Sequence, residues 1–221
     1  MISLKALGAR FLARWVHQKT RKWADNPVEA QHRTFEQLIA KGRNTGFGAE
    51  HGFAEIRSYS DFSTRVPVRD YETLKPFVER IFKGEEDVLW PGKPLYFAKT
   101  SGTTSGAKYI PITRESIKEQ VRASRNAILN YIHKTGNADF VNGKMIFLQG
   151  SPILDEKNGI KVGRLSGISA HYVPGYLQKN RLPSWETNCI EDWETKVEKV
   201  IEETVSEDMT VIAGIPSWVQ M

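Results

Sequence analysis

The 221-residue chain is 40% apolar, with ten phenylalanines and six tryptophans, which is enough to bury a sizeable core and excludes a disordered protein. Its single cysteine, Cys189, excludes an intramolecular disulfide and is read as a packing residue rather than a catalytic thiol. The net charge of +5 lies at the N-terminus, because residues 1–24 hold six Lys and Arg and no acid, while the remainder has 25 basic against 26 acidic residues. The balance of basic and acidic residues after residue 24 argues against a nucleic-acid-binding protein.

Residues 1–24 have the pattern of a basic amphipathic leader helix. The apolar side chains on one face are Leu4, Leu7, Phe11 and Trp15. We expect this helix to dock on its own domain with a solvated basic face, and contact with an anionic membrane is the alternative. No apolar run reaches the roughly 18 residues of a spanning helix, and early arginines interrupt any secretory core, so the sequence indicates a cytoplasmic protein.

Residues 25–82 predict helices separated by turns. Pro27 behind Asn26 is a helix start, and the glycine-rich segment 42–48 that follows is expected to be a loop. Between residues 60 and 82, Asp61 and Asp70 are expected to cap short helices.

The segment Thr100–Lys108, TSGTTSGAK, has the composition of a phosphate-binding loop. It is flanked by two extended stretches, Leu95–Lys99 and Tyr109–Ile112. Gly102 and Gly106 allow backbone N–H groups to approach an anion, and Lys108 supplies a positive charge. The hydroxyl donors are Ser101, Thr103, Thr104 and Ser105, with Thr100 ahead of them.

Two common phosphate loops are excluded by spacing. A P-loop requires GxxxxGK followed by Ser or Thr, and residue 107, five after Gly102, is alanine. A dinucleotide fingerprint requires a second glycine where Thr104 stands. A plain polar turn between two strands remains the alternative to a phosphate site.

Beyond the loop the sequence alternates helices and strands. Thr113 is expected to cap a long helix with Glu115 in its first turn, and helical spacing recurs over 190–201. Strands are expected over 144–149 and from Met209. The alternation predicts an α/β fold with a mixed or parallel sheet flanked by helices.

Two further segments between these elements contain residues that could have a function. Gly150 and Ser151 end the strand at 144–149 and are weak candidates for the acyl-substrate pocket, with an ordinary turn as the alternative. His171 lies in a segment expected to be irregular, residues 163–176, and is read as a packed or hydrogen-bonded residue rather than a general base. No spacing of side chains predicts a metal site.

The loop resembles the phosphate-binding signature of acyl-adenylate-forming enzymes. The surrounding text, VPVRDYETLKPFVERIFKGEEDVLWPGKPLYFAKTSGTTSGAKYIPIT, and the terminal AGIPSWVQM are similar to the auxin-responsive-promoter family of acyl-acid amido synthetases. The resemblance covers nearly the whole chain from about Asn26 onward. It implies that residues 25–221 are the N-terminal portion of the large domain of such an enzyme, behind the leader helix 1–24.

The resemblance also implies a reaction. A carboxylate attacks the α-phosphorus of ATP, with Mg²⁺, to give an acyl-adenylate and pyrophosphate, and an amine, such as an amino acid, then displaces AMP. The loop residues Ser101, Thr103 and Thr104 would hold the β- and γ-phosphates while Lys108 neutralises developing charge. Thr100 stands where many members have serine, which keeps a hydroxyl.

The family's adenine and ribose motifs and its small C-terminal domain are not found in this sequence. We therefore expect a fragment of a longer protein that is inactive alone. Two alternatives stay open: an adenylate-former that transfers its acyl group to a thiol such as coenzyme A, and a non-catalytic, membrane-associated binding module.

Overall fold

The computed structural model describes residues 3–100 and 106–220, and of Tyr176 the backbone alone. The chain forms two compact units, each built from discontinuous segments. The hairpin unit comprises Arg21–Ile117 and Asp155–Val162, and the parallel-sheet unit comprises Met1–Thr20, Lys118–Leu154 and Gly163–Met221.

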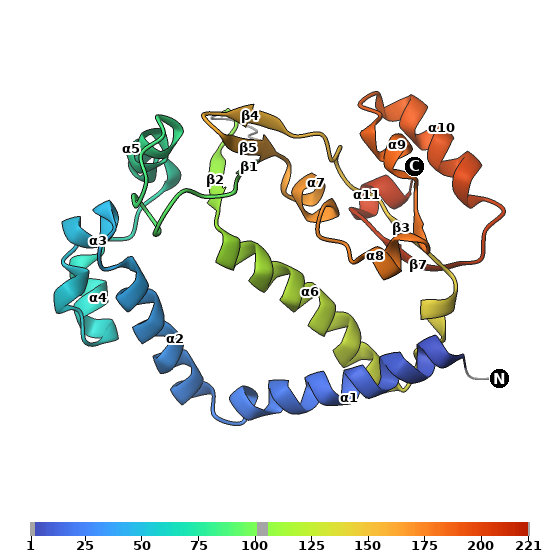
Figure 1. Ribbon diagram of the computed structural model, residues 1–221, viewed down its shortest axis with the longest axis horizontal. Coiled ribbons are helices and arrows are strands. Elements are labelled where there is room, and N and C mark those ends of the chain that lie inside the picture. Colours follow the sequence, from blue (N-terminus) through green and yellow to red (C-terminus); the bar gives the residue numbers. More distant parts are fainter. Residues whose placement is uncertain (1–2, 101–105, 221) are drawn as a thin grey trace. The chain divides into compact units, whose positions relative to one another are not determined.

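Across the described residues, five α-helices precede the first strand, and short strands and helices are then mixed along the rest of the chain (Figure 1). The α-helices are α1 Leu4–Ala24, α2 Pro27–Gly42, α3 Gly46–Glu50, α4 Tyr59–Arg65, α5 Tyr71–Phe82, α6 Arg114–Thr135, α7 Leu165–Ala170, α8 Gly175–Gln178, α9 Trp185–Cys189, α10 Trp193–Thr204 and α11 Pro216–Val219, with 3₁₀ turns η1 Phe53–Glu55 and η2 Asp139–Asn142. The strands are β1 Tyr96–Lys99, β2 Tyr109–Ile112, β3 Lys144–Phe147, β4 Asp155–Lys157, β5 Ile160–Gly163, β6 Arg181–Leu182 and β7 Met209–Ala213.

Two sheets confirm the α/β class. One has the strand order β2-β1-β5-β4, in which β1 pairs antiparallel with β2 and β4 antiparallel with β5. The other has the order β6-β3-β7, and both neighbours run parallel to β3. The sequence predicted β1, β2, β3 and β7 but not β4, β5 or β6, because strands of two to four residues with several polar positions show little apolar periodicity.

The hairpin unit is held by an apolar core between α5 and its sheet. The buried members include Phe77 and Val78 of α5, Phe97 of β1 and Ile160 of β5. The ring of Phe82 stacks on Phe97 with centroids 3.9 Å apart. This packing fixes α5 against the strands that carry the phosphate loop.

The leader helix docks within the parallel-sheet unit, but not by the face that its larger side chains suggested. Ala6, Ala13 and Val16 are the buried residues of α1, and they cluster with Leu129 and Ile132 of α6. The apolar face that we expected to dock is exposed. Small residues allow two helix backbones to approach closely, so the alanines and not the bulky residues make this contact.

Helix caps follow the sequence in most places. Asp70 caps α5 by accepting a hydrogen bond from the Thr73 amide at 2.9 Å, and Thr113 caps α6 through the Ser116 amide at 3.1 Å. Asp61 is not the cap of α4. Ser58 is the N-cap, and Asp61 completes a capping box by accepting the Ser58 amide.

Two segments expected to be irregular contain short helices. The glycine-rich segment 42–48 turns into α3, whose N-cap is the buried Thr45. The segment 163–176 contains α7 and the start of α8. The sequence did not predict these helices, because glycine has a low helix propensity. Tertiary contacts that support a helix cannot be read from propensity alone.

Histidine pairing in the parallel-sheet unit makes stability depend on pH. The rings of His17 and His133 stack with centroids 3.8 Å apart. Desolvation, and then the charge of His17, hold the pKa of His133 below its usual 6.5. The unfolded chain therefore binds a proton more readily than the folded one, so this contribution to stability is full above about pH 6.5 and is lost as pH falls through the lowered pKa.

We expect the melting temperature to fall between about pH 7.5 and pH 5, and the fall to be smaller in His133→Gln. His32→Gln, on the exposed surface of α2, is the matched control and should keep the wild-type pH dependence. An unchanged pH dependence in His133→Gln would contradict this prediction.

Within the described parts of the chain, no helix combines the length and apolar character needed to cross a bilayer.

Candidate functional site

The phosphate loop is framed by an antiparallel strand pair. Tyr96 of β1 lies opposite Ile112 of β2, and Lys99 lies opposite Tyr109. The Thr100 amide donates to the Lys108 carbonyl at 2.9 Å, so the ladder continues to the two ends of the loop. The candidate residues Ser101, Gly102, Thr103, Thr104 and Ser105 lie outside the described residues, and their phosphate contacts stay a prediction.

Gly106 has a backbone conformation that favours glycine. Its φ of +79° is in the region that side chains other than glycine rarely adopt, and among the described residues, its chain neighbours aside, no atom lies within 4 Å of the position a Cβ would take. The glycine is therefore needed for chain direction rather than for close packing. A loop that turns back through a left-handed residue can present consecutive N–H groups to one anion.

Lys108 leaves the loop beside the start of α5. Its Nζ lies 5.5 Å from the centroid of the Tyr71 ring. The Tyr71 hydroxyl accepts a hydrogen bond from the Tyr109 amide at 2.8 Å and donates to the Tyr109 carbonyl at 3.4 Å. Tyr71 thus fixes the strand that follows the loop and places an aromatic face under the lysine.

Tyr71→Phe should loosen the exit of the loop. Without the hydroxyl, the part-buried Tyr109 amide loses its acceptor, which costs about 1–3 kcal/mol. We expect amide hydrogen exchange at Tyr109 to accelerate by about tenfold or more, as measured by mass spectrometry on peptides of β2. Tyr59→Phe on the exposed surface of α4 is the control, and equal exchange in both variants would contradict this role for Tyr71.

An open groove of about 760 Å³ borders the N-terminus of α5. Its lining residues are Pro67, Val68, Arg69, Asp70 and Thr73. Hydrogen bonds from the backbone and the hydroxyl of Thr73 hold the pKa of Asp70 below its usual value, with a further contribution from the positive charge of Lys108. The Asp70 carboxylate therefore stays ionised at neutral pH and connects the groove electrostatically to the loop's lysine.

Arg69 gives this groove a positively charged wall. Its Nη2 lies 2.8 Å from Nε2 of His51 and 3.9 Å from the Glu50 carboxylate. The guanidinium also lies 5.7 Å from the Phe47 ring. No role was predicted for Arg69 or Tyr71 from the sequence. Their only local signal is that they flank the predicted cap Asp70. The residues that they contact, His51 and Tyr109, lie 18 and 38 positions away along the chain.

Gly150 and Ser151 lie in the parallel-sheet unit, in the turn that follows β3. The Ser166 hydroxyl accepts a hydrogen bond from the Gly150 amide at 3.2 Å, and the Ser151 hydroxyl accepts one from the Ile153 amide at 3.3 Å. A Cβ on Gly167 would lie 2.2 Å from the Ser151 carbonyl oxygen, so α7 packs closely on this turn. The contacts describe an ordered turn and do not test its role in acyl binding.

His171 is exposed and hydrogen-bonded, which agrees with the prediction of a packed or hydrogen-bonded residue. Its Nε2 lies 2.9 Å from the Pro152 carbonyl oxygen, and its ring meets Trp185 edge to face with centroids 5.0 Å apart. Cys189 is half-buried at the end of α9. Among residues 3–100 and 106–220, no group of three or more His, Cys, Asp or Glu side chains is arranged to hold a metal ion.

Known proteins of similar sequence are amido synthetases. The chain is 24% identical over 136 residues to a jasmonoyl–L-amino acid synthetase of Nicotiana attenuata, covering 60% of this chain and 23% of that protein. It is 43% identical over 58 residues to a probable indole-3-acetic acid-amido synthetase of Oryza sativa subsp. japonica, covering 25% of this chain and 12% of that protein. The chain thus spans less than a third of the length of these relatives.

The fold is also that of a solved amido synthetase. The structure of the GH3.15 acyl acid amido synthetase superposes with a TM-score of 0.62 at 19% identity, covering 75% of this chain and 29% of the other. A model of the GH3 family N-terminal domain matches residues 16–180, well over half of the chain. The chain therefore belongs to the GH3 family, the auxin-responsive family of acyl-acid amido synthetases that its loop and flanking sequence resemble.

Proposed function

We propose that the full-length protein activates a carboxylic acid with ATP and joins the acyl group to an amine, such as an amino acid. In the first step a carboxylate oxygen bonds to the α-phosphorus and pyrophosphate leaves. In the second, the amine nitrogen attacks the acyl carbon, AMP leaves, and the amine gives up a proton. Membership of the GH3 family carries this proposal, and a solved relative described as a complex with 2,4-DB supports an acid as the substrate.

In this proposal the phosphate loop binds the phosphates of ATP during the first step. Ser101, Thr103 and Thr104 hold the β- and γ-phosphates, while Gly102 and Gly106 let the backbone approach them. Lys108 neutralises charge that develops on the leaving pyrophosphate, and Thr103 acts beside it. Mg²⁺ accompanies ATP as the counterion of the phosphates.

The described end of the loop fits such an anion. Gly106 has its positive φ with open space at the Cβ position. Lys108 makes no salt bridge within residues 3–100 and 106–220, and its charge contributes to the lowered pKa of Asp70, which already accepts two hydrogen bonds from Thr73. A lysine that makes no salt bridge with a carboxylate can bind a phosphate group.

The acyl acid and the amine meet residues beyond this loop. We retain Gly150 and Ser151 as candidates for the acyl pocket, since they follow the carboxyl end of the parallel strand β3, where ligands gather in open α/β sheets. We place the reaction in the cytoplasm, and we expect the 221-residue chain alone to be inactive.

The nucleophile decides between an amide and a thioester product. Transfer to a thiol such as coenzyme A is the second candidate, because the loop serves both reactions equally. The test offers ATP, Mg²⁺, a panel of acids, and either a mixture of amino acids or coenzyme A to the full-length protein, with products identified by mass spectrometry. Amide formation supports the proposal, and thioester as the only product would overturn it.

A further inference from the structure

Helix α1 has two unlike apolar faces. The inner face consists of Ala6, Ala13 and Val16, which pack on α6 and η2 within the parallel-sheet unit. At about 3.6 residues per turn, these residues lie on the side of the helix opposite Leu4 and Phe11. The bulky side chains of α1 therefore take no part in its packing on α6 and η2.

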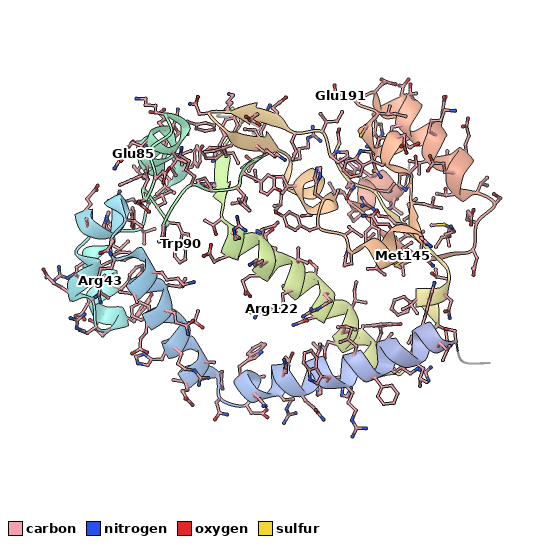
Figure 2. The ribbon with its side chains drawn as sticks, in the orientation of Figure 1. Arg43, Glu85, Trp90, Arg122, Met145 and Glu191 are labelled. Atoms are coloured by element: carbon pink, nitrogen blue, oxygen red, sulfur yellow. The ribbon has the colours of Figure 1, made fainter. Side chains whose placement is uncertain are left out.

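The outer face carries a row of large apolar side chains, which we call the α1 stripe. It consists of Leu4, Leu7, Phe11, Leu12 and Trp15. Leu4 is 88% exposed, Phe11 68% and Trp15 51%. Side chains project from the edge of α1 that faces away from α6 (Figure 2). Five neighbouring large apolar side chains on one helix face are more than the isolated exposed residues of ordinary surfaces.

Positive charge borders the α1 stripe on both sides. By helical position, Lys5 lies along one border and Arg10 and Arg14 lie along the other, while Lys19 lies between Trp15 and Leu12. Lys19 Nζ lies 3.6 Å from the centroid of the Trp15 ring. Residues 1–24 contain no acid, and two carboxylates pair with arginines of α1: Asp139 of η2 lies 3.9 Å from Arg10, and Asp25 lies 3.0 Å from Arg21.

We propose that the α1 stripe docks the protein on the surface of an anionic lipid membrane. An apolar stripe with aromatic residues, flanked by lysine and arginine, matches a bilayer interface, where rings enter the headgroup region and cations meet lipid phosphates. The charge complementarity selects a negatively charged surface over a neutral one. The contact is peripheral, because α1 lies along the surface and keeps its inner face on α6.

The test measures co-flotation of the full-length protein with vesicles. We expect binding to phosphatidylcholine vesicles that contain about one third phosphatidylserine, weaker binding to phosphatidylcholine alone, and loss of binding as salt is raised. The double variant Phe11→Ser/Trp15→Ser should reduce binding by about tenfold or more. Both side chains are exposed in the described chain, and a wild-type melting temperature of the variant checks that they are exposed in the full-length protein as well.

Two controls separate this contact from general stickiness. Ile201→Ser/Val205→Ser removes two exposed apolar side chains, one in α10 and one at its C-cap, and should leave binding unchanged. Lys5→Gln/Lys19→Gln should weaken binding to the anionic vesicles, whereas Lys134→Gln/Lys179→Gln, two exposed lysines outside α1, should not.

Three results would overturn the proposal. One is no binding by the wild-type protein to anionic vesicles. Another is equal binding by wild type and Phe11→Ser/Trp15→Ser. The third is a dimer, measured by light scattering, that Phe11→Ser/Trp15→Ser dissociates, because the α1 stripe would then be covered by a second copy of the chain.

Discussion

Replacing Lys108 with alanine should lower acid-dependent pyrophosphate release by the full-length protein by about 10²-fold or more. Lys108 ends the phosphate loop, beside the ring of Tyr71 and without a salt bridge in the described part of the chain. In the proposed reaction, its positive charge would lie where pyrophosphate leaves. Removing it takes away an interaction that strengthens as the transition state forms, so the loss should appear mainly in kcat.

Three companion variants locate this effect. Thr103→Ala should also slow pyrophosphate release, and Lys108→Arg, which keeps the charge but not the compact ammonium, should retain part of it. Lys75→Ala removes an exposed lysine from α5 in the same unit and should have no effect. A Lys108→Ala variant with wild-type kcat would show that the loop's lysine does not serve the leaving phosphates.

Replacing Gly48 with alanine should destabilise the hairpin unit by about 2–3 kcal/mol or more. A Cβ at this position would lie 2.0 Å from the Gly42 carbonyl oxygen, which already accepts the Thr45 hydroxyl at 2.7 Å. The backbone must shift, and the buried cap of α3 would shift with it. Since α3 and the residue after it carry Glu50 and His51, the contacts that hold Arg69 in the groove wall would be disturbed as well.

Thermal melting of the full-length protein checks this second prediction. Gly8→Ala is the matched control, because no atom lies within 4 Å of the added methyl on α1, and alanine in a helix interior should be neutral or stabilising by about 0.5–1 kcal/mol. A melting temperature for Gly48→Ala that equals or exceeds that of Gly8→Ala would contradict the close approach of the two backbones.

The strands on either side of the predicted phosphate loop could be read from the sequence. Glycine, hydroxyl and lysine in one short segment between two extended stretches is a local pattern, and β1 and β2 formed where those stretches predicted them. The contacts that position the loop are not local. Tyr71 reaches Tyr109 across 38 residues, and Arg69 reaches His51 across 18. No periodicity or composition reports such pairs.

The leader helix shows a different limit of the sequence. Its amphipathic pattern correctly predicted a helix, but hydrophobicity ranks Leu4 and Phe11 above Ala6 and Ala13 as core residues. Close packing of α1 on α6 selected the alanines instead. The periodicity indicated where an apolar face lies, whereas the partner's shape decided which face was buried.

The most direct test of the proposed function is pyrophosphate release from ATP and Mg²⁺ by the full-length protein against a panel of carboxylic acids. We expect pyrophosphate release that depends on at least one acid and that is slower in the Lys108→Ala variant. No release with any acid would contradict it and would favour a binding protein that keeps the phosphate loop without the chemistry.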